Sequence, residues 1–282
     1  MSASSDHSER AVQGVPEVVG LIPAAGMATR LQPFPCSKEV YPVGFARDAK
    51  SGLPRPKVAA HYLLEKFRAA GITKAFLVMK DGKWDIPSYF REGDLVGLSL
   101  AYIVIAGSLG PPDTLDRAYP FLEQKRVAFG FPDILFGPDD AYARLITRQE
   151  QTGADVVLGL HEIEDPRVWD MVDCDKAGLV RDIVMKPAST LLTHGWCCAV
   201  WTPAFTEFLH SFLRADETRR NLDRLASKAN DPGGDLAVGV VLLAALRAGL
   251  SIQSLTFPGE RYLDIGTPEN LLKAVRQFQQ PQ

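Results

Sequence analysis

The alternation of short apolar runs with amphipathic segments constrains the fold of this chain more than any other sequence feature. Apolar runs of strand length lie at residues 18–23, 75–79, 99–105 and 127–131. Apolar residues recur at helical spacing in the segments 57–70 and 139–149. Short runs without polar alternation are typical of buried parallel strands, and strand–helix–strand order indicates a doubly wound sheet. We therefore expect an α/β fold with a doubly wound, mostly parallel sheet.

The pattern changes after Gly153. Four strand-like runs follow with few helical segments between them, at 156–161, 171–174, 179–185 and 197–201. We expect an antiparallel insertion over about residues 154–201 that covers one side of the main sheet and faces the substrate. Helical segments return at 203–213, 236–248 and 268–278. We expect a flexible polar tail over residues 1–16 and a single domain over 17–282, because no repeat or low-complexity linker divides the chain.

Charge and composition exclude several classes of protein. The formal net charge of the 282 residues is −3, so no basic excess exists to bind a nucleic acid. The most apolar run, 238–246, is about half the length that a membrane-spanning helix needs. The N-terminus lacks the apolar segment of a secretory signal, and the four cysteines lack CxxC spacing. We therefore expect a cytoplasmic protein with reduced thiols, and neither nucleic acid nor membrane as a partner.

A loop of small residues, Ala24–Leu31, follows the first predicted strand. Ligands of open parallel sheets bind at the carboxyl ends of the strands, in such loops. Small side chains let backbone N–H groups approach a phosphate, and Arg30 supplies a cation. The loop is neither a GxGxxG fingerprint nor a P-loop. It can therefore be a phosphate-binding loop or a tight turn with a surface arginine.

The same loop, followed by Ser37–Val43, resembles the signature of the sugar-1-phosphate nucleotidyltransferases, L-A-G-G-x-G-T-R-L…K-x-x-x-P-V. That family includes glucose-1-phosphate thymidylyltransferases and UTP–glucose-1-phosphate uridylyltransferases. Four later segments resemble the family's G-T-A-x-A, G-D-N, D-P-x-x-Y-G-V-V…E-K-P and W-x-D-I-G-T-P-E motifs in the same order, at 110–115, 131–136, 165–187 and 262–269. The resemblance implies a Rossmann-like nucleotidyltransferase fold with a sugar-binding insertion. It also implies transfer of a nucleoside monophosphate from a nucleoside triphosphate to a sugar 1-phosphate, giving pyrophosphate and a nucleoside diphosphate-sugar.

The resemblance also implies roles for individual residues. Arg30 and Lys38 would be catalytic, because they would hold the triphosphate and its α-phosphate. Asp133 and Asp264 would bind Mg²⁺, which typically takes one or two carboxylates together with substrate phosphates. Lys186 would bind the phosphate of the sugar phosphate. The remaining expected contacts are Ala24, Ala25, Gly26, Met27, Ala28, Thr29 and Gly110 to the nucleotide, and Asp170 and Gly195 to the sugar phosphate.

Several positions depart from the family pattern. Ala28 stands where glycine is usual, and a gapless overlay puts Pro132 at the position of the metal-binding aspartate. Asp133 would then need a shifted backbone, with Asp139 or Asp140 as substitutes. Met185 replaces a glutamate that usually holds sugar hydroxyls, and Asp170 replaces a glycine, which suggests a sugar other than glucose. The sequence does not identify the base.

Two alternatives stay open. The acceptor can be a non-sugar phosphate, such as a phosphorylated alcohol. The chain can instead be a catalytically silent paralogue that binds nucleotide or sugar phosphate and regulates a partner. Ser108 lies near a G-x-S-x-G-like pattern, but its spacing is shifted and two prolines follow, so the pattern does not indicate a nucleophile. Members of the family are commonly homodimers or homotetramers, so the resemblance implies a homo-oligomer of unspecified size.

Overall fold

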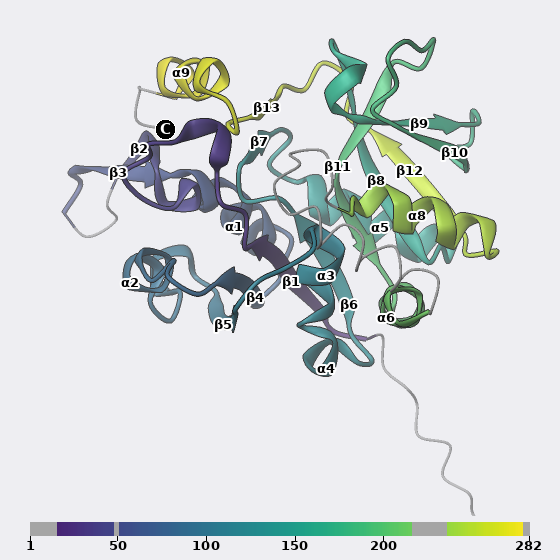
Figure 1. Cartoon of the computed structure of the whole chain (residues 1–282), viewed down its shortest axis with the longest axis horizontal. Helices are drawn as coiled ribbons and strands as arrows, with labels where there is room; N and C mark the ends of the chain where they lie inside the picture. The colour runs from purple at the N-terminus through teal and green to yellow at the C-terminus, as the bar shows by residue number, and fades with distance from the viewer. Residues whose placement is uncertain (1–15, 48–50, 216–235, 279–282) are drawn as a thin grey trace, which may run out of the picture.

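Four neighbouring parallel strands form one side of the main sheet. The computed structural model describes residues 16–47, 51–215 and 236–278 (Figure 1). These strands lie in the order β6 (Arg126–Gly130), β1 (Val18–Ala24), β4 (Lys74–Lys80) and β5 (Ser99–Ile105), and β5 is the edge strand. Each lies within two residues of a predicted strand. The predicted α/β fold with its parallel sheet is therefore confirmed.

Further strands continue this sheet beyond β6. Four of them belong to the insertion and pair antiparallel: β8 (Val156–Glu162), β9 (Asp170–Cys174), β10 (Val180–Met185) and β11 (His194–Trp201). Strand β11 pairs directly with β6, from Cys198↔Gly130 to Trp201↔Val127, and β12 (Ile252–Thr256) adds to β8 in parallel as the ninth strand. The expectation that the insertion covers one side of the sheet is wrong. Its strands extend the sheet, because the free edge of β6 binds β11 through backbone hydrogen bonds.

Helices cover both faces of the sheet. One face packs against α1 (Ala59–Ala69), α2 (Asp85–Phe90) and α5 (Ala141–Thr152). The other packs against α3 (Pro111–Asp116), α4 (Tyr119–Leu122), α6 (Pro203–Arg214) and α8 (Val238–Arg247). Along β1, Ile22 enters the first core and Leu21 the second, as the alternation of side chains in a strand requires. No helix in the described part of the chain is long and apolar enough to cross a membrane.

Close packing of α1 on the sheet depends on Gly20. A Cβ at this position would lie 2.7 Å from the ring of Phe67 on α1 and 2.8 Å from Cβ of Ala75 on β4. A larger residue would therefore push the helix away from the strand that leads into the first loop.

Two small ribbons and one helix complete the fold. Strand β7 (Ile134–Phe136) pairs antiparallel with β13 (Tyr262–Asp264), and β2 (Pro42–Arg47) pairs with β3 (Pro54–Val58). Helix α9 (Pro268–Gln277) lies beside β2 and β13 in Figure 1. The Thr267 hydroxyl accepts a hydrogen bond from Asn270 N–H at 3.3 Å and caps α9, as its Thr-Pro start indicates. Of the predicted polar tail, only residue 16 lies inside the described ranges.

Candidate active site

The loops after the parallel strands meet at one edge of the sheet. Strand β1 ends at Ala24, and residues 25–28 lead to a 3₁₀ turn, η1 (Thr29–Leu31). Strand β6 ends at Gly130, shortly before Asp133. Parallel strands present their carboxyl ends at the same edge, so the small-residue loop and Asp133 lie on the same side of the molecule. Gly26, Met27 and Thr29 are exposed, which leaves the loop accessible to a ligand.

Lys38 connects the first loop to Asp133. It lies in the 3₁₀ turn η2 (Lys38–Val40), and its ammonium forms an ion pair with the Asp133 carboxylate. A Cβ at Gly26 would lie 3.8 Å from Lys38 Nζ, so the lysine also lies against the small-residue loop. Burial by itself lowers the pKa of Lys38, but neighbouring carboxylates, Asp133 foremost, more than offset this and raise the pKa. The lysine is therefore held as a cation.

Asp264 reaches the same place from a different element. In the β7–β13 ribbon Asp264 is opposite Ile134, and the N–H of Ile265 donates to the Asp133 carbonyl at 2.9 Å. Burial raises the pKa of the Asp264 carboxyl, and the charge of Asp133 raises it further. The strand-like run before Asp264 suggests a late strand of the doubly wound sheet, but the structure corrects this: that strand pairs with β7 in a separate ribbon. The ribbon delivers Asp264 because β7 follows the end of β6.

Asp133 reaches this group despite Pro132. The two substitutes considered from the sequence are engaged elsewhere. Asp139 accepts a hydrogen bond from Lys66 Nζ at 2.6 Å, and Asp140 stands at the N-terminus of α5. The structure therefore pairs Asp133, and neither substitute, with Lys38.

Arg30 completes a group of four charged side chains. A Cβ at Gly266 would lie 2.8 Å from Arg30 Nη2 and 2.9 Å from Asp264 Oδ1, so the guanidinium and the carboxylate meet beside this glycine. Gly266 N–H donates to Asp264 Oδ1 at 2.7 Å and fixes the carboxylate. Ala28, just before η1, has φ 50° and ψ 40°, the left-handed conformation that glycine adopts most easily. The left-handed conformation of residue 28 therefore explains why glycine is usual at this position in the family.

The group could offer a magnesium ion two carboxylates, and the substrate would supply further oxygen ligands. Across residues 16–47, 51–215 and 236–278, no three or more His, Cys, Asp or Glu side chains are placed to hold a metal. Magnesium commonly takes only one or two carboxylates, with phosphates and waters filling its remaining positions. Asp133 and Asp264 fit that requirement.

The three residues predicted to bind the sugar phosphate lie on neighbouring strands. Asp170 begins β9 opposite Met185 of β10, Lys186 follows β10, and Gly195 lies in β11. Lys186 is exposed, whereas Gly195 is buried. A Cβ at Gly195 would lie 2.8 Å from Ile163 Cγ1, so the absence of a side chain allows β11 to pack closely. The structure therefore shows a packing role for Gly195.

Asp170 lies against the first turn of α8. A Cβ at Gly239 would collide with its carboxylate. Burial raises the pKa of Asp170, and the charge of Lys186 partly opposes that shift. The carboxylate thus faces a helix N-terminus and lies within electrostatic range of Lys186.

An aromatic contact joins this strand group to the charged group. The rings of Trp169 and Tyr262 meet edge to face with centroids 4.8 Å apart, and Tyr262 begins the strand that ends at Asp264. The N–H of Lys186 donates to the Trp169 carbonyl at 3.1 Å. The strands that carry Asp170 and Lys186 are therefore anchored to the ribbon that carries Asp264.

Gly110 and Ser108 have local roles at the start of α3. Gly110 is buried with φ 127°, and a Cβ there would lie 2.5 Å from the Leu236 carbonyl oxygen. The Ser108 hydroxyl lies 2.6 Å from the Thr114 hydroxyl and donates to the Gly110 carbonyl at 2.7 Å. Gly110 therefore allows a close backbone approach, and Ser108 stabilises the turn before α3.

The sequence interpretation missed Lys83 and Glu39. Lys83 follows β4 and reaches the first loop, and Glu39 is its buried partner next to Lys38. Both could have been found, because β4 ends at the same edge as β1 and Glu39 lies within the segment that resembles the family.

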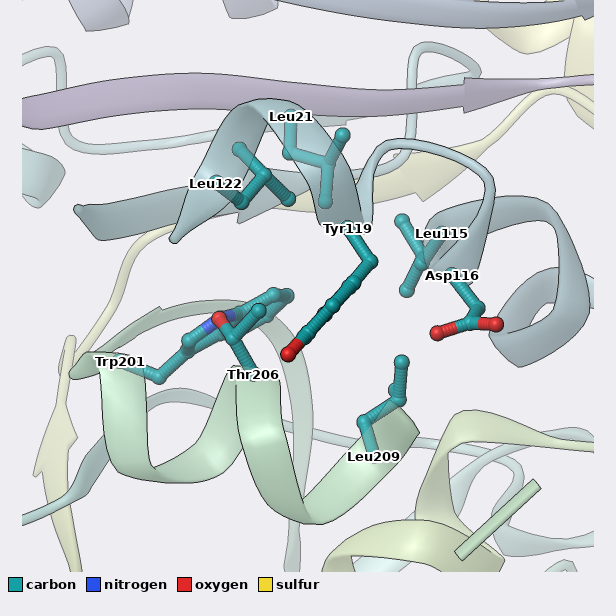
Figure 2. Close-up of a pocket in the computed structure, with 8 residues that line it drawn as sticks. All are labelled: Leu21, Leu115, Asp116, Tyr119, Leu122, Trp201, Thr206 and Leu209. Atoms are coloured by element: carbon teal, nitrogen blue, oxygen red, sulfur yellow. The ribbon is translucent and has the colours of Figure 1, made fainter. Parts of the chain in front are cut away.

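One pocket lies away from this edge, beneath α3, α4 and α6. Figure 2 shows the Tyr119 side chain across it, with the hydroxyl toward α6, where it donates to Glu207 at 2.6 Å. Its lining is mainly apolar and consists of Leu21, Leu115, Asp116, Tyr119, Leu122, Trp201, Thr206 and Leu209. None of the predicted site residues lines it, so it has no part in the candidate site.

The fold is an α/β fold with a charged group at one edge of its sheet, and the comparisons show which proteins it is similar to. No protein-family model matches the chain. Glucose-1-phosphate thymidylyltransferase of Streptomyces antibioticus is 24% identical over 257 residues, which are 91% of this chain and 65% of that protein. The low-salt glycan biosynthesis nucleotidyltransferase Agl11 of Haloferax volcanii is 22% identical over 258 residues, 90% of this chain and 64% of that protein. The chain thus spans less than two thirds of the length of either relative.

Solved structures share the fold. A Bacillus anthracis protein assigned as a glucose-1-phosphate thymidylyltransferase and crystallised with sucrose aligns with a TM-score of 0.75 at 17% identity, covering 94% of this chain and 96% of that one. A UDP-glucose pyrophosphorylase from Acinetobacter baumannii aligns with a TM-score of 0.70 at 17% identity, covering 94% and 93%. These homologues are sugar-1-phosphate nucleotidyltransferases, so the resemblance inferred from the motifs is confirmed.

Proposed function

We propose that the chain transfers a nucleoside monophosphate from a nucleoside triphosphate to a sugar 1-phosphate, in a reaction that requires Mg²⁺. The observation that carries this proposal is the convergence of Arg30, Lys38, Asp133 and Asp264 beside the small-residue loop. Two cations next to two carboxylates supply what a triphosphate and its magnesium ion need. The names of the two sequence relatives support the same class of reaction.

In this reaction the protein would mainly position the substrates and neutralise charge. An oxygen of the sugar phosphate attacks the α-phosphorus, the bond to the bridging oxygen breaks, and pyrophosphate leaves with that electron pair. Arg30 and Lys38 would bind the triphosphate and offset the charge that develops on the phosphate oxygens. Asp133 and Asp264 would hold the magnesium ion, which neutralises phosphate charge when bound. Backbone N–H groups of residues 24–29 would orient the nucleotide.

Lys186 would bind the acceptor phosphate, with Asp170 beside it. Its exposed side chain follows β10, which the Trp169–Tyr262 contact joins to the Asp264 strand. A charged side chain in place of the family's glycine at 170 favours an acceptor other than glucose 1-phosphate. Cytoplasmic location and homo-oligomerisation stay predictions.

A pyrophosphate-release assay tests the proposal. Nucleoside triphosphates are screened against sugar 1-phosphates and phosphorylated alcohols, with Mg²⁺ and with chelator. We expect turnover with at least one sugar 1-phosphate, loss of turnover with chelator, and kcat lowered by at least ~10²-fold in D133N and D264N. The matched control is D173N, an exposed aspartate on β9, which should leave kcat unchanged.

Three results would contradict parts of this proposal. Turnover only with phosphorylated alcohols would replace the sugar acceptor. Binding without pyrophosphate release would identify a silent paralogue. A normal D133N next to an inactive D264N would remove Asp133 from the metal site.

A further inference from the structure

Lys83 lies between the two segments that carry the cations of the site. Its ammonium donates to the Ala24 carbonyl at 2.7 Å, to the Gly26 carbonyl at 3.1 Å and to Glu39 Oε1 at 2.7 Å. An ammonium has three donors, and these three acceptors occupy them all. Lys83 therefore acts on the backbone of the first loop and on Glu39.

The ion pair between Lys83 and Glu39 is buried. Its side chain is only 1% exposed and that of Lys83 is 11% exposed, so the ion pair is largely removed from solvent. A buried carboxylate without a cation is strongly unfavourable, which ties the position of Glu39 to Lys83. Because Glu39 directly follows Lys38 in η2, fixing Glu39 also fixes the turn that presents Lys38.

A second contact from the same segment acts in the same direction. Asp85, at the start of α2, accepts hydrogen bonds from the Ser37 N–H at 2.6 Å and from the Ser37 hydroxyl at 2.7 Å. Residues 83–85 therefore hold η2 on both sides of Lys38. Of the two contacts, only that of Lys83 also reaches the loop that leads to Arg30.

We propose that Lys83 is a positioning residue that fixes the first loop against η2 and thereby sets the relative position of Arg30 and Lys38. The inference rests on the proposed function, since the two cations matter together only if they bind one triphosphate. Lys83 acts through its neighbours, because its donors are occupied by protein oxygens. A displacement of about 1 Å in such a site can lower a rate by ~10²-fold.

Lys83→Met and Lys74→Met form a matched pair of variants. Lys74 begins β4, the strand that Lys83 follows, and its ion pair with Glu17 at 2.9 Å is solvent-exposed, so K74M loses a lysine that does not hold the loop. Glu39→Gln keeps the shape of the side chain and removes only its charge, which preserves the test if K83M fails to fold. Two readouts are needed: steady-state kinetics, and backbone hydrogen exchange by mass spectrometry.

In K83M we expect faster exchange over residues 25–31 and 38–40, a kcat lowered by about 10- to 100-fold, and a smaller change in the KM of the sugar phosphate. E39Q should change both readouts in the same direction, and K74M should change neither. Unchanged exchange in these segments, or a kcat within about twofold of wild type in K83M and E39Q, would overturn the proposal. If wild type shows no turnover at all, the proposed function fails, and the exchange measurement alone decides whether Lys83 holds the two segments.

Discussion

At the residue scale, the backbone geometry of Lys186 determines where its side chain lies. Its φ of 40° is unusual for a residue with a side chain, and such conformations often occur at functional sites. The hydrogen bond from its N–H to the Trp169 carbonyl holds this conformation. The ammonium is thereby presented to solvent at the end of β10.

Replacement of Lys186 by alanine should affect one substrate selectively. Loss of a charge-assisted contact costs about 1.5–3 kcal/mol, so the KM of the sugar phosphate should rise by about 10- to 100-fold, with the KM of the nucleotide nearly unchanged. Steady-state kinetics with each substrate varied in turn measures this. K176A, which removes an exposed lysine between β9 and β10, is the control. Equal changes in both KM values would remove Lys186 from the acceptor site.

The charged residues of the site were predictable because they follow the ends of strands and lie in recognisable motifs. The missed Lys83 follows the end of a strand but lies in no motif. Arg30, Lys38 and Asp133 follow directly from strand ends and motif order, and the structure brings them together. Their ligands stay a prediction. Lys83 lies in no motif that we matched, and its function depends on two carbonyl oxygens, which a sequence does not display.

At the scale of elements, α8 depends on a residue far from it in the chain. The Asp170 carboxylate lies against the first turn of α8, where a negative charge interacts favourably with the helix dipole. The sequence predicted Asp170 as a sugar contact and gave no indication of this helix contact. Asp170 and α8 are far apart in the chain, because β10, β11 and α6 lie between them.

Asp170→Gly should therefore have two effects. The raised pKa of Asp170 means that burial of its charge outweighs the favourable contact with α8, so in wild type the free energy of unfolding should decline as Asp170 ionises with rising pH. Asp170→Gly should remove this part of the pH dependence, measured by urea unfolding at several pH values. It should also change the ranking of sugar 1-phosphates by kcat/KM, because the variant restores the family's glycine. An altered pH dependence with an unchanged ranking would mean that Asp170 does not contact the sugar.

The ribbon β7–β13 explains why element-level prediction was partly wrong. The strand-like run of residues 261–263 before Asp264 does form a strand, but it pairs with β7 outside the main sheet. The β2–β3 hairpin was not predicted at all, since the prolines at 54 and 56 argue against a strand except at an edge. Pairing partners are non-local, so periodicity identifies a strand without identifying its sheet.

For the whole molecule, the same limit explains the position of the insertion. Helix and strand boundaries followed from periodicity and Gly, Pro and Thr signals, because these are local. Whether the strands after Gly153 cover the sheet or extend it depends on whether the β6 edge is free, and the local pattern does not encode this. The nine-stranded sheet places its two cores on opposite faces, and the buried His61 and His161 both pack against rings of the first core.

Two buried histidines should make the stability of the molecule depend on pH. His161 is fully buried, with Nε2 2.7 Å from the Gly137 carbonyl and Nδ1 3.3 Å from Cys197 Sγ. Burial lowers the pKa of His161, opposed by the Gly137 carbonyl and by the charge of Glu260. Burial also lowers the pKa of His61, whose ring packs edge to face on Phe90 with centroids 5.6 Å apart.

The sign of the effect follows from these directions. The unfolded chain protonates each histidine near pH ~6.5, before the folded protein does, so falling pH stabilises the unfolded state. The stability that the neutral histidines contribute is therefore fully present above about pH 6.5 and is lost as the pH falls toward their folded pKa values. The buried carboxyls Glu39 and Asp264 act in the opposite sense, because burial raises their pKa. Comparison of variants separates the two contributions.

We expect H161Q and H61Q each to lose less free energy of unfolding than wild type when the pH is lowered from about 7.5 to about 5.5. Urea unfolding followed by circular dichroism at several pH values measures this difference directly. Both variants will be less stable than wild type at pH ~7.5, since each replaces a packed ring, so the informative quantity is the slope against pH. A slope equal to that of wild type in both variants would show that other groups cause the acid sensitivity. A reduced slope in H161Q alone would assign the effect to the ring that lies between Gly137 and Cys197.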